Sequence, residues 1–229
     1  MLSNLFLNMA LVGAEWVLYL LVILSLISIS ILFERFSFYK SANRKSEAFT
    51  DEIRKTVHFK AYDKALKAAQ DRVDDCKKGV VPLDASVVIA LIKRKLNPQA
   101  NQDSESLFQV SQDALLRSKN LWEKNLSLLA SIGSNSPFIG LFGTVLGIIQ
   151  AFHSLSGQSG AGAQAVTAGL SEALIATAIG ILVAIPAVIG FNLYNRKVQS
   201  AVAEAEALQN YLVSHLSSDR SASTEQGED

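Results

Sequence analysis

Long apolar stretches alternate with polar segments along this chain of 229 residues. Each of three apolar blocks is about as long as the roughly 20 apolar residues that a helix needs to cross the hydrocarbon core of a membrane. Between Lys124 and Arg196, which enclose the last two blocks, the only formally charged side chain is Glu172. The pattern predicts an all-α membrane protein with three transmembrane helices, at residues 16–34, 125–153 and 165–195.

The polar segment at residues 35–124 has the spacing of helices rather than of strands. Apolar side chains recur there at helical intervals, and no run alternates between polar and β-branched residues. Breaks are expected near Pro82 and at Pro98, with Asp84 and Asp103 as N-cap residues of the helices that follow. The segment is therefore predicted to be a helical domain.

The last helix of this domain is expected to begin near Ser104 and to continue without a break into the second span. It would then contain about 50 residues and be about 70 Å long. A further amphipathic helix is predicted after the third span. The remaining ranges are a short interfacial helix at 1–15, a link at 154–164, the amphipathic helix at 196–216 and a disordered tail at 217–229.

Positive charge is distributed unevenly, although the formal net charge is zero. All 21 Lys and Arg residues lie within residues 35–124 or 196–220. Because Lys and Arg concentrate on the cytoplasmic side of a membrane, the amino terminus and the link are expected outside. The helical domain and the carboxyl terminus are expected in the cytoplasm. The one cysteine, Cys76, lies in that domain, so no disulfide framework is available.

Small residues form a stripe along each of the last two spans. Gly140, Thr144 and Gly147 share one face of the second span, and Ala173 and Thr177 begin a similar stripe in the third. Such stripes let helix backbones approach closely, so one interpretation is a tightly packed bundle in which each threonine bonds its own backbone. The expected packing residues are Gly140, Gly143, Gly147, Ala173, Gly180, Ala184 and Pro186.

Two features favour a functional interpretation of the hairpin. Counted inward from the outer ends of their spans, Thr144 and Thr177 lie at similar depths of roughly 12 to 16 Å, near the middle of the bilayer. Glu172 lies one and a half turns outward of Thr177, where an ionised carboxylate is costly unless it faces water or a partner. Alternatively, Glu172 reaches the headgroups or stays protonated between helices. It is also about 140° around the helix from Thr177, so the two side chains do not both point at one axis.

The segments SPFIGLFGTVLGIIQAF and GLSEALIATAIGILVAIPAV resemble the ExbB/TolQ family, which is more distantly related to the MotA stator proteins. The resemblance covers most of residues 125–200. It implies a multi-pass subunit of a bacterial inner-membrane motor driven by the proton gradient. It also implies a pentamer of this chain around the transmembrane helices of a dimeric, ExbD/TolR-like partner, which has a single span and brings the proton-accepting aspartate. By position, Thr144 and Thr177 would line the pore, and Glu172 would be the family's glutamate.

Iron-complex or vitamin uptake, outer-membrane maintenance and gliding motility all use similar hairpins, so the branch of the family stays open. A TonB-like or TolA-like protein is a further expected partner, and membrane lipids surround the chain. A flagellar MotA-like stator is an alternative, although four spans are expected there. A passive membrane scaffold is another.

An enzyme is disfavoured, because the histidines are scattered and Cys76 has no matching base; they are His58, His153 and His215. No catalytic residue, cofactor site or metal site is therefore expected. No nucleic-acid binding is expected either, since basic and acidic residues are interleaved in the helical domain.

Overall fold

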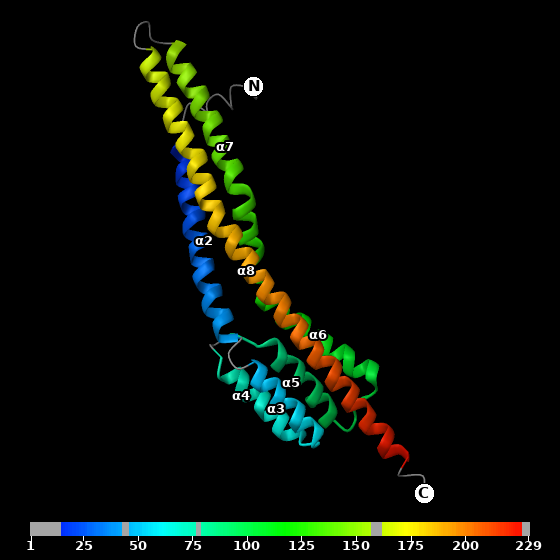
Figure 1. Ribbon diagram of the computed structural model, residues 1–229. Coiled ribbons are helices and arrows are strands. Elements are labelled where there is room, and N and C mark those ends of the chain that lie inside the picture. Colours follow the sequence, from blue (N-terminus) through cyan, green and yellow to red (C-terminus); the bar gives the residue numbers. More distant parts are fainter. Residues whose placement is uncertain (1–14, 43–45, 77–78, 157–161, 226–229) are drawn as a thin grey trace. The chain divides into compact units, whose positions relative to one another are not determined.

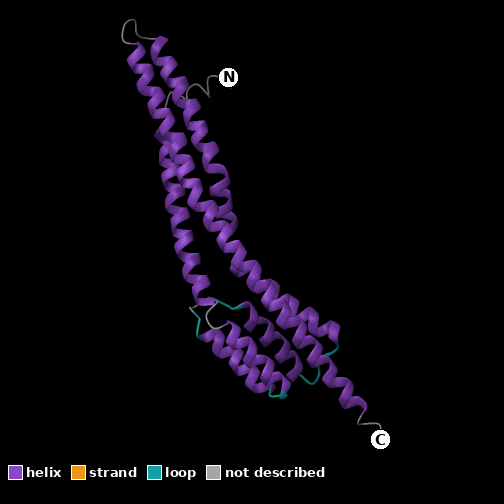
Figure 2. Ribbon diagram, in the orientation of Figure 1, coloured by secondary structure: helices purple, strands orange, loops and turns teal. Residues whose placement is uncertain are grey.

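Helices make up almost all of the computed structural model, which describes residues 15–42, 46–76, 79–156 and 162–225. No strand occurs in these ranges (Figure 2). Three of the helices are long and apolar enough to cross a membrane, which confirms the all-α class and the three predicted spans. The helices are α2 (Glu15–Ala42), α3 (Ser46–His58), α4 (Tyr62–Asp74), α5 (Leu83–Leu96), α6 (Ser104–Glu123), α7 (Leu126–Ser156) and α8 (Gly162–Glu225). The interfacial helix predicted at residues 1–15 falls almost entirely outside the described residues.

The chain divides into two compact units. One comprises Met1–Glu34 and Asn125–Leu193 and contains the apolar parts of α2, α7 and α8. We call it the transmembrane unit. The other comprises Arg35–Lys124 and Tyr194–Asp229, and we call it the loop unit.

Within the transmembrane unit, α2 packs along the hairpin formed by α7 and α8 (Figure 1). Near one end, Val17 and Leu21 of α2 form a buried cluster with Leu146 of α7. Near the other end, Leu32 of α2 lies against Gly190 of α8. The side chains that cover the outside of the bundle are mostly large and apolar, as a lipid environment favours.

The loop unit has its own core, built from helices α3 to α6 and the last part of α8. A buried ion pair joins α4 to α5, with Arg72 Nη2 2.7 Å from the Asp84 carboxylate. The same carboxylate accepts hydrogen bonds from the Ser46 hydroxyl and from the Ala85 backbone N–H. Asp84 is therefore not an N-cap, because Pro82 holds that position of α5. Asp103 is the N-cap of α6, as predicted, and accepts from the Ser106 backbone N–H.

The prediction of one unbroken helix from Ser104 into the second span is wrong. Helix α6 ends at Glu123, Lys124 has an extended ψ of 136°, and Asn125 has a left-handed φ of 63°. Asparagine tolerates this conformation because its short polar side chain can hydrogen-bond locally. The last carbonyls of α6 find other donors, since the Arg35 guanidinium and the Tyr39 hydroxyl both donate to the Trp122 carbonyl.

Helix α8 is longer than the sequence pattern indicated. It continues from the third span through residues 196–216 and on to Glu225, and so includes most of the tail expected to be disordered. No proline or glycine stands between Gly190 and Gly227, so no residue in this stretch breaks the pattern of helical hydrogen bonds. The last residues, 226–229, lie outside the described ranges.

Candidate functional site

Helices α7 and α8 meet backbone to backbone at the centre of the hairpin. A methyl group on Gly140 would lie 2.6 Å from the Ala176 carbonyl oxygen, and one on Gly180 would lie 2.6 Å from the Ser136 carbonyl oxygen. Both distances are too short for a real side-chain carbon, so only glycine fits at these two positions. The close approach is thus made within one chain, between its own second and third spans.

The other predicted packing residues fall in three kinds of environment. Gly147 faces Ala173 of α8, and Gly143 faces both Ala176 of α8 and Val17 of α2. Ala173 and Ala184 are buried. Pro186 is exposed on the surface of α8, away from the contact.

The two threonines lie at nearly the same level of the hairpin. Gly147 faces Ala173, and Gly140 faces Gly180. Each step of one residue along α7 is therefore matched by a step of one residue in the opposite direction along α8, because the helices are antiparallel. Thr144 is therefore level with Ala176, the neighbour of Thr177. The offset between the two threonines is about 1.5 Å, the rise of one helical residue.

Their hydroxyl groups differ in hydrogen bonding. The Thr144 hydroxyl is buried and donates to the Leu141 carbonyl at 2.5 Å, as threonines in membrane helices often do. The Thr177 hydroxyl oxygen is also buried, but it has no partner in the part of the chain that the structure describes. A buried polar group without a partner costs about 1 to 3 kcal/mol, so it requires an explanation.

Glu172 lies on the exposed side of α8, one and a half turns from Thr177. Its carboxylate makes no ion pair within the described ranges, whereas nearby Ser171 bonds the Thr167 carbonyl of its own helix. The structure thus separates Glu172, on the outside of the single chain, from the buried threonines.

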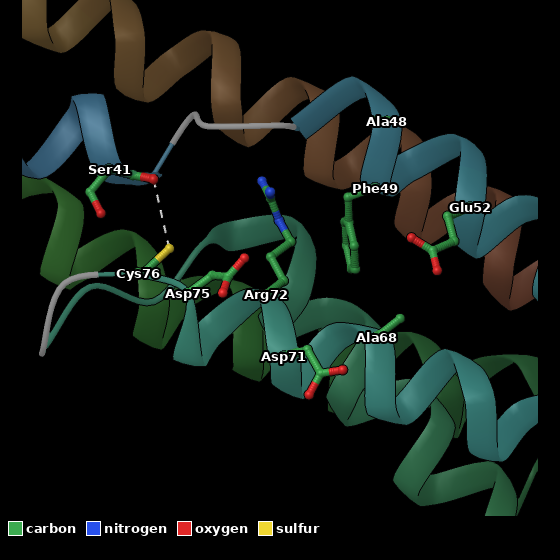
Figure 3. Close-up of a pocket in the computed structure, with 9 residues that line it drawn as sticks. All are labelled: Ser41, Ala48, Phe49, Glu52, Ala68, Asp71, Arg72, Asp75 and Cys76. Carbon is green, nitrogen blue, oxygen red and sulfur yellow. Dashed lines mark hydrogen bonds between the residues drawn. The ribbon is translucent and has the colours of Figure 1, made fainter.

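The loop unit contains a cavity of about 230 Å³, shown in Figure 3. Phe49 and Arg72 line it, with the carboxylates of Glu52, Asp71 and Asp75 around them. Cys76 donates from its thiol to the Ser41 carbonyl at 3.7 Å, and burial raises the pKa of this thiol. Within the described residues, no group of three or more His, Cys, Asp or Glu side chains is arranged to hold a metal ion.

The histidines are less scattered than the sequence suggested. His58 of α3 and His215 of α8 lie with their ring centroids 6.3 Å apart in the loop unit, and Tyr211 stacks on His215. Their separation of more than 150 positions in the sequence concealed this proximity.

Comparison with known proteins gives the hairpin a context. A model of the MotA/TolQ/ExbB proton channel family matches residues 83–207, which is more than half of the chain. The chain belongs to the MotA/TolQ/ExbB proton channel family. This finding confirms the resemblance that the two hairpin segments suggested.

Individual relatives within the MotA/TolQ/ExbB family extend the match. The Tol-Pal system protein TolQ of Haemophilus influenzae is 31% identical over 210 residues, which cover 86% of this chain and 85% of the relative. TolQ of Pseudomonas aeruginosa is 30% identical over 189 residues, with 80% of each chain covered. The biopolymer transport protein ExbB of Neisseria gonorrhoeae is 46% identical over 92 residues, which cover 40% of this chain and 41% of the relative. The chain is accordingly a membrane protein of a proton-channel family.

Two polar features of the spans were not predicted from the sequence. Ser28 of α2 is buried, and its hydroxyl has no partner among the described residues. Asn135 of α7 is exposed at a level where the rest of the bundle surface is mostly apolar. A search for amides within the apolar blocks would have found Asn135, whereas burial of Ser28 could be known only from the packing.

Proposed function

We propose that this chain is the ring-forming subunit of an inner-membrane motor that the proton gradient drives. In this proposal the loop unit lies in the cytoplasm, and five copies of the chain surround the transmembrane helices of two single-span partner chains. Each partner carries an intramembrane aspartate. The observation that carries the proposal is the buried, unpartnered hydroxyl of Thr177, level with Thr144 at the middle of the hairpin.

A hydroxyl group suits contact with a carboxyl group that gains and loses a proton. It donates a hydrogen bond to an ionised carboxylate and accepts one from a protonated carboxylic acid. Since Thr144 already donates to Leu141, Thr177 is the threonine whose hydroxyl has no partner in the described single chain. Because its oxygen is covered there, the side chain has to change rotamer to meet a partner carboxylate. A partner aspartate that moves from one copy of Thr177 to the next as it is protonated would turn proton flow into rotation.

The alternative functions explain less of the hairpin. A passive scaffold accounts for the contact between Gly140 and Gly180, but it leaves the Thr177 hydroxyl unpartnered and Glu172 without a role. A MotA-like stator is expected to have four spans, whereas the described part of this chain has three candidate spans.

The share of this chain that aligns with each relative favours a Tol-type complex as the first one to test. The two TolQ relatives align with 80% or more of this chain, including its loop unit, whereas the gonococcal ExbB aligns with 40%. We therefore propose outer-membrane maintenance as the work of this motor, with a TolR-like chain and a TolA-like chain as partners.

The experiment is to purify the tagged chain from its native membranes in mild detergent and to determine the mass and composition of the complex. We expect a single-span protein with an intramembrane Asp at two copies for every five of this chain. Substituting Asn for that Asp should leave the complex intact and abolish gradient-dependent work. Purification of this chain alone, from cells that contain such a partner, would contradict the proposal.

A further inference from the structure

One face of α7 carries polar side chains within the first turns of its span. Ser127, Ser131, Ser134 and Asn135 are all exposed, at positions i, i+4, i+7 and i+8 of the helix. We call this set the polar face of α7. It lies on the outside of the bundle, away from the contact that Gly140 makes with α8.

The surface of α8 at the same levels is different. Continuing the one-for-one register of the hairpin from Gly140 and Gly180 brings the polar face level with residues 185–193 of α8. The exposed side chains there are mostly aliphatic, and Asn192, near the end level with Ser127, is the polar exception. The large aliphatic ones are Ile185, Val188, Ile189 and Leu193. Lipid therefore suits the surface of α8 over residues 185–189, whereas the face of α7 beside it is polar.

The depth of the polar face is counted from Asn125, which precedes the first residue of the apolar span, Leu126. Asn125 Nδ2 donates to Glu34 Oε2 at 2.9 Å, which places the end of α2 in this unit level with the start of α7. At 1.5 Å per residue, the polar face extends from about 3 Å to about 15 Å beyond Asn125. With a hydrocarbon core about 30 Å thick that begins near Asn125, this is half of the membrane, the half at the Asn125 end of the span.

The hydrogen bonds of the polar face leave the amide oxygen of Asn135 without a donor, whereas the Ser134 hydroxyl accepts from Asn135 Nδ2 at 3.3 Å. Asn135 Nδ2 donates to the Ser131 carbonyl at 2.8 Å, and the Ser131 hydroxyl donates to the Ser127 carbonyl at 2.9 Å. No hydrogen bond to Asn135 Oδ1 occurs between residues whose placement the structure gives. An amide oxygen exposed to hydrocarbon loses its hydration without compensation, at a cost of several kcal/mol by transfer measurements. Lipid is therefore a poor neighbour for this face.

We propose that in the assembled ring the polar face of α7 borders a column of water, through which protons leave towards the cytoplasm. This inference rests on the proposed function. It adds a path by which protons leave after they have passed the central threonines. The amide oxygen of Asn135 and the serine oxygens accept hydrogen bonds from water, so they hold it against an otherwise apolar wall. Ser134 is ten residues from Thr144 and about 80° around the helix from it, so water has to bridge about 15 Å along the axis between them. Asn135 lies on the opposite side of α7 from Thr144, at the outer edge of this column.

The competing explanation is a dry contact. Serine and asparagine at intervals of four residues also suit close packing of two membrane helices, with hydrogen bonds across the seam. A neighbouring copy of the chain would then cover the polar face and exclude water. The two explanations differ in whether a water-soluble reagent can reach these side chains in the intact complex.

The test is cysteine labelling of the whole complex in inside-out membrane vesicles. The native thiol is first removed by Cys76→Ser. Ser134→Cys is then compared with Leu26→Cys. The native Leu26 side chain is 64% exposed on α2. Leu26 precedes Glu34 by eight residues and Ser134 follows Asn125 by nine, so the two cysteines have matched depth. The probe is a charged, membrane-impermeant methanethiosulfonate.

We expect Ser134→Cys to react at least about tenfold faster than Leu26→Cys, because the reactive thiolate forms in water and not in hydrocarbon. Ser131→Cys should also react, as a second variant in case Ser134→Cys assembles poorly. Equal rates for Ser134→Cys and Leu26→Cys would overturn the proposal. So would reaction confined to Ser127→Cys at the end of the span, since that pattern means a dry contact at greater depth.

This labelling does not depend on a working motor. If the chain binds no partner, or if its central threonines prove dispensable, the proposed function is refuted. The relative labelling rates of the cysteines at positions 134 and 26 would still report whether water reaches the polar face. Conversely, an unreactive Ser134→Cys in a complex that contains the partner would refute the exit path and leave the motor proposal standing.

Discussion

Replacing Gly180 with alanine should weaken the hairpin measurably. The new methyl group would lie 2.6 Å from the Ser136 carbonyl oxygen and 3.0 Å from the Gly140 Cα atom. Ordinary contact begins at 3.4 Å, so the α7 and α8 backbones have to separate by up to about 0.8 Å. Both obstacles are backbone atoms, which cannot rotate away as a side chain can. Overpacking of this kind typically costs about 1 to 3 kcal/mol.

The assay is thermal unfolding of the detergent-solubilised protein, followed by circular dichroism. For a chain of this size, 1 kcal/mol shifts Tm by about 2 to 4 °C, so we expect Gly180→Ala to lower Tm by about 2 to 12 °C. Ala178→Leu adds more volume on the exposed side of the same helix and should leave Tm nearly unchanged. The double variant with Gly140→Ala should cost less than the sum of the two, because one methyl group already separates the helices. An unchanged or higher Tm for Gly180→Ala would refute the close-contact argument.

Three further predictions concern the loop unit and the topology. Asp84→Asn should destabilise the chain by about 3 to 5 kcal/mol in the same assay, because it leaves the buried guanidinium of Arg72 without its counter-ion; a loss below about 1 kcal/mol would contradict a structural role for the pair. Because burial raises the pKa of the Cys76 thiol, its thiolate fraction at neutral pH should be lower than in the unfolded chain. Its labelling rate should therefore rise at higher pH than in denaturant, and identical pH profiles would count against this burial. In intact cells, Ser159→Cys should react with an impermeant thiol reagent, whereas Cys76 should react only after permeabilisation; the reverse order would invert the proposed orientation.

The helices and the three spans were predictable because both depend on local patterns. Long apolar blocks mark α2, α7 and α8 whatever they pack against, and Asp103 marks the start of α6 through a hydrogen bond within its own first turn. The break at Asn125 was missed because asparagine is only a weak signal for a left-handed conformation. The Arg35 and Tyr39 side chains that satisfy the last carbonyls of α6 come from a distant segment, which local patterns do not indicate.

The candidate site was predictable in composition but not in arrangement. The stripes of small residues indicated close helix packing, yet the sequence alone did not say which helix fills each stripe. Gly140 and Gly180 proved to face each other within one chain. Likewise, two threonines at similar depth were visible in the sequence, but the difference between their hydroxyls was not. That difference depends on the rotamers and neighbours of Thr144 and Thr177, which packing determines.

The most direct test of the proposed motor removes the threonine hydroxyls and keeps the side-chain volume. The double variant Thr144→Val and Thr177→Val should still form the complex with its partner, because valine matches threonine in shape. Gradient-dependent work should fall at least about tenfold, since a lost hydrogen bond to a charged group costs about 1.5 to 3 kcal/mol. The matched variant with serine at both positions keeps the hydroxyls and should retain most of the activity. A fully active double valine variant, in a complex of normal composition, would contradict the account.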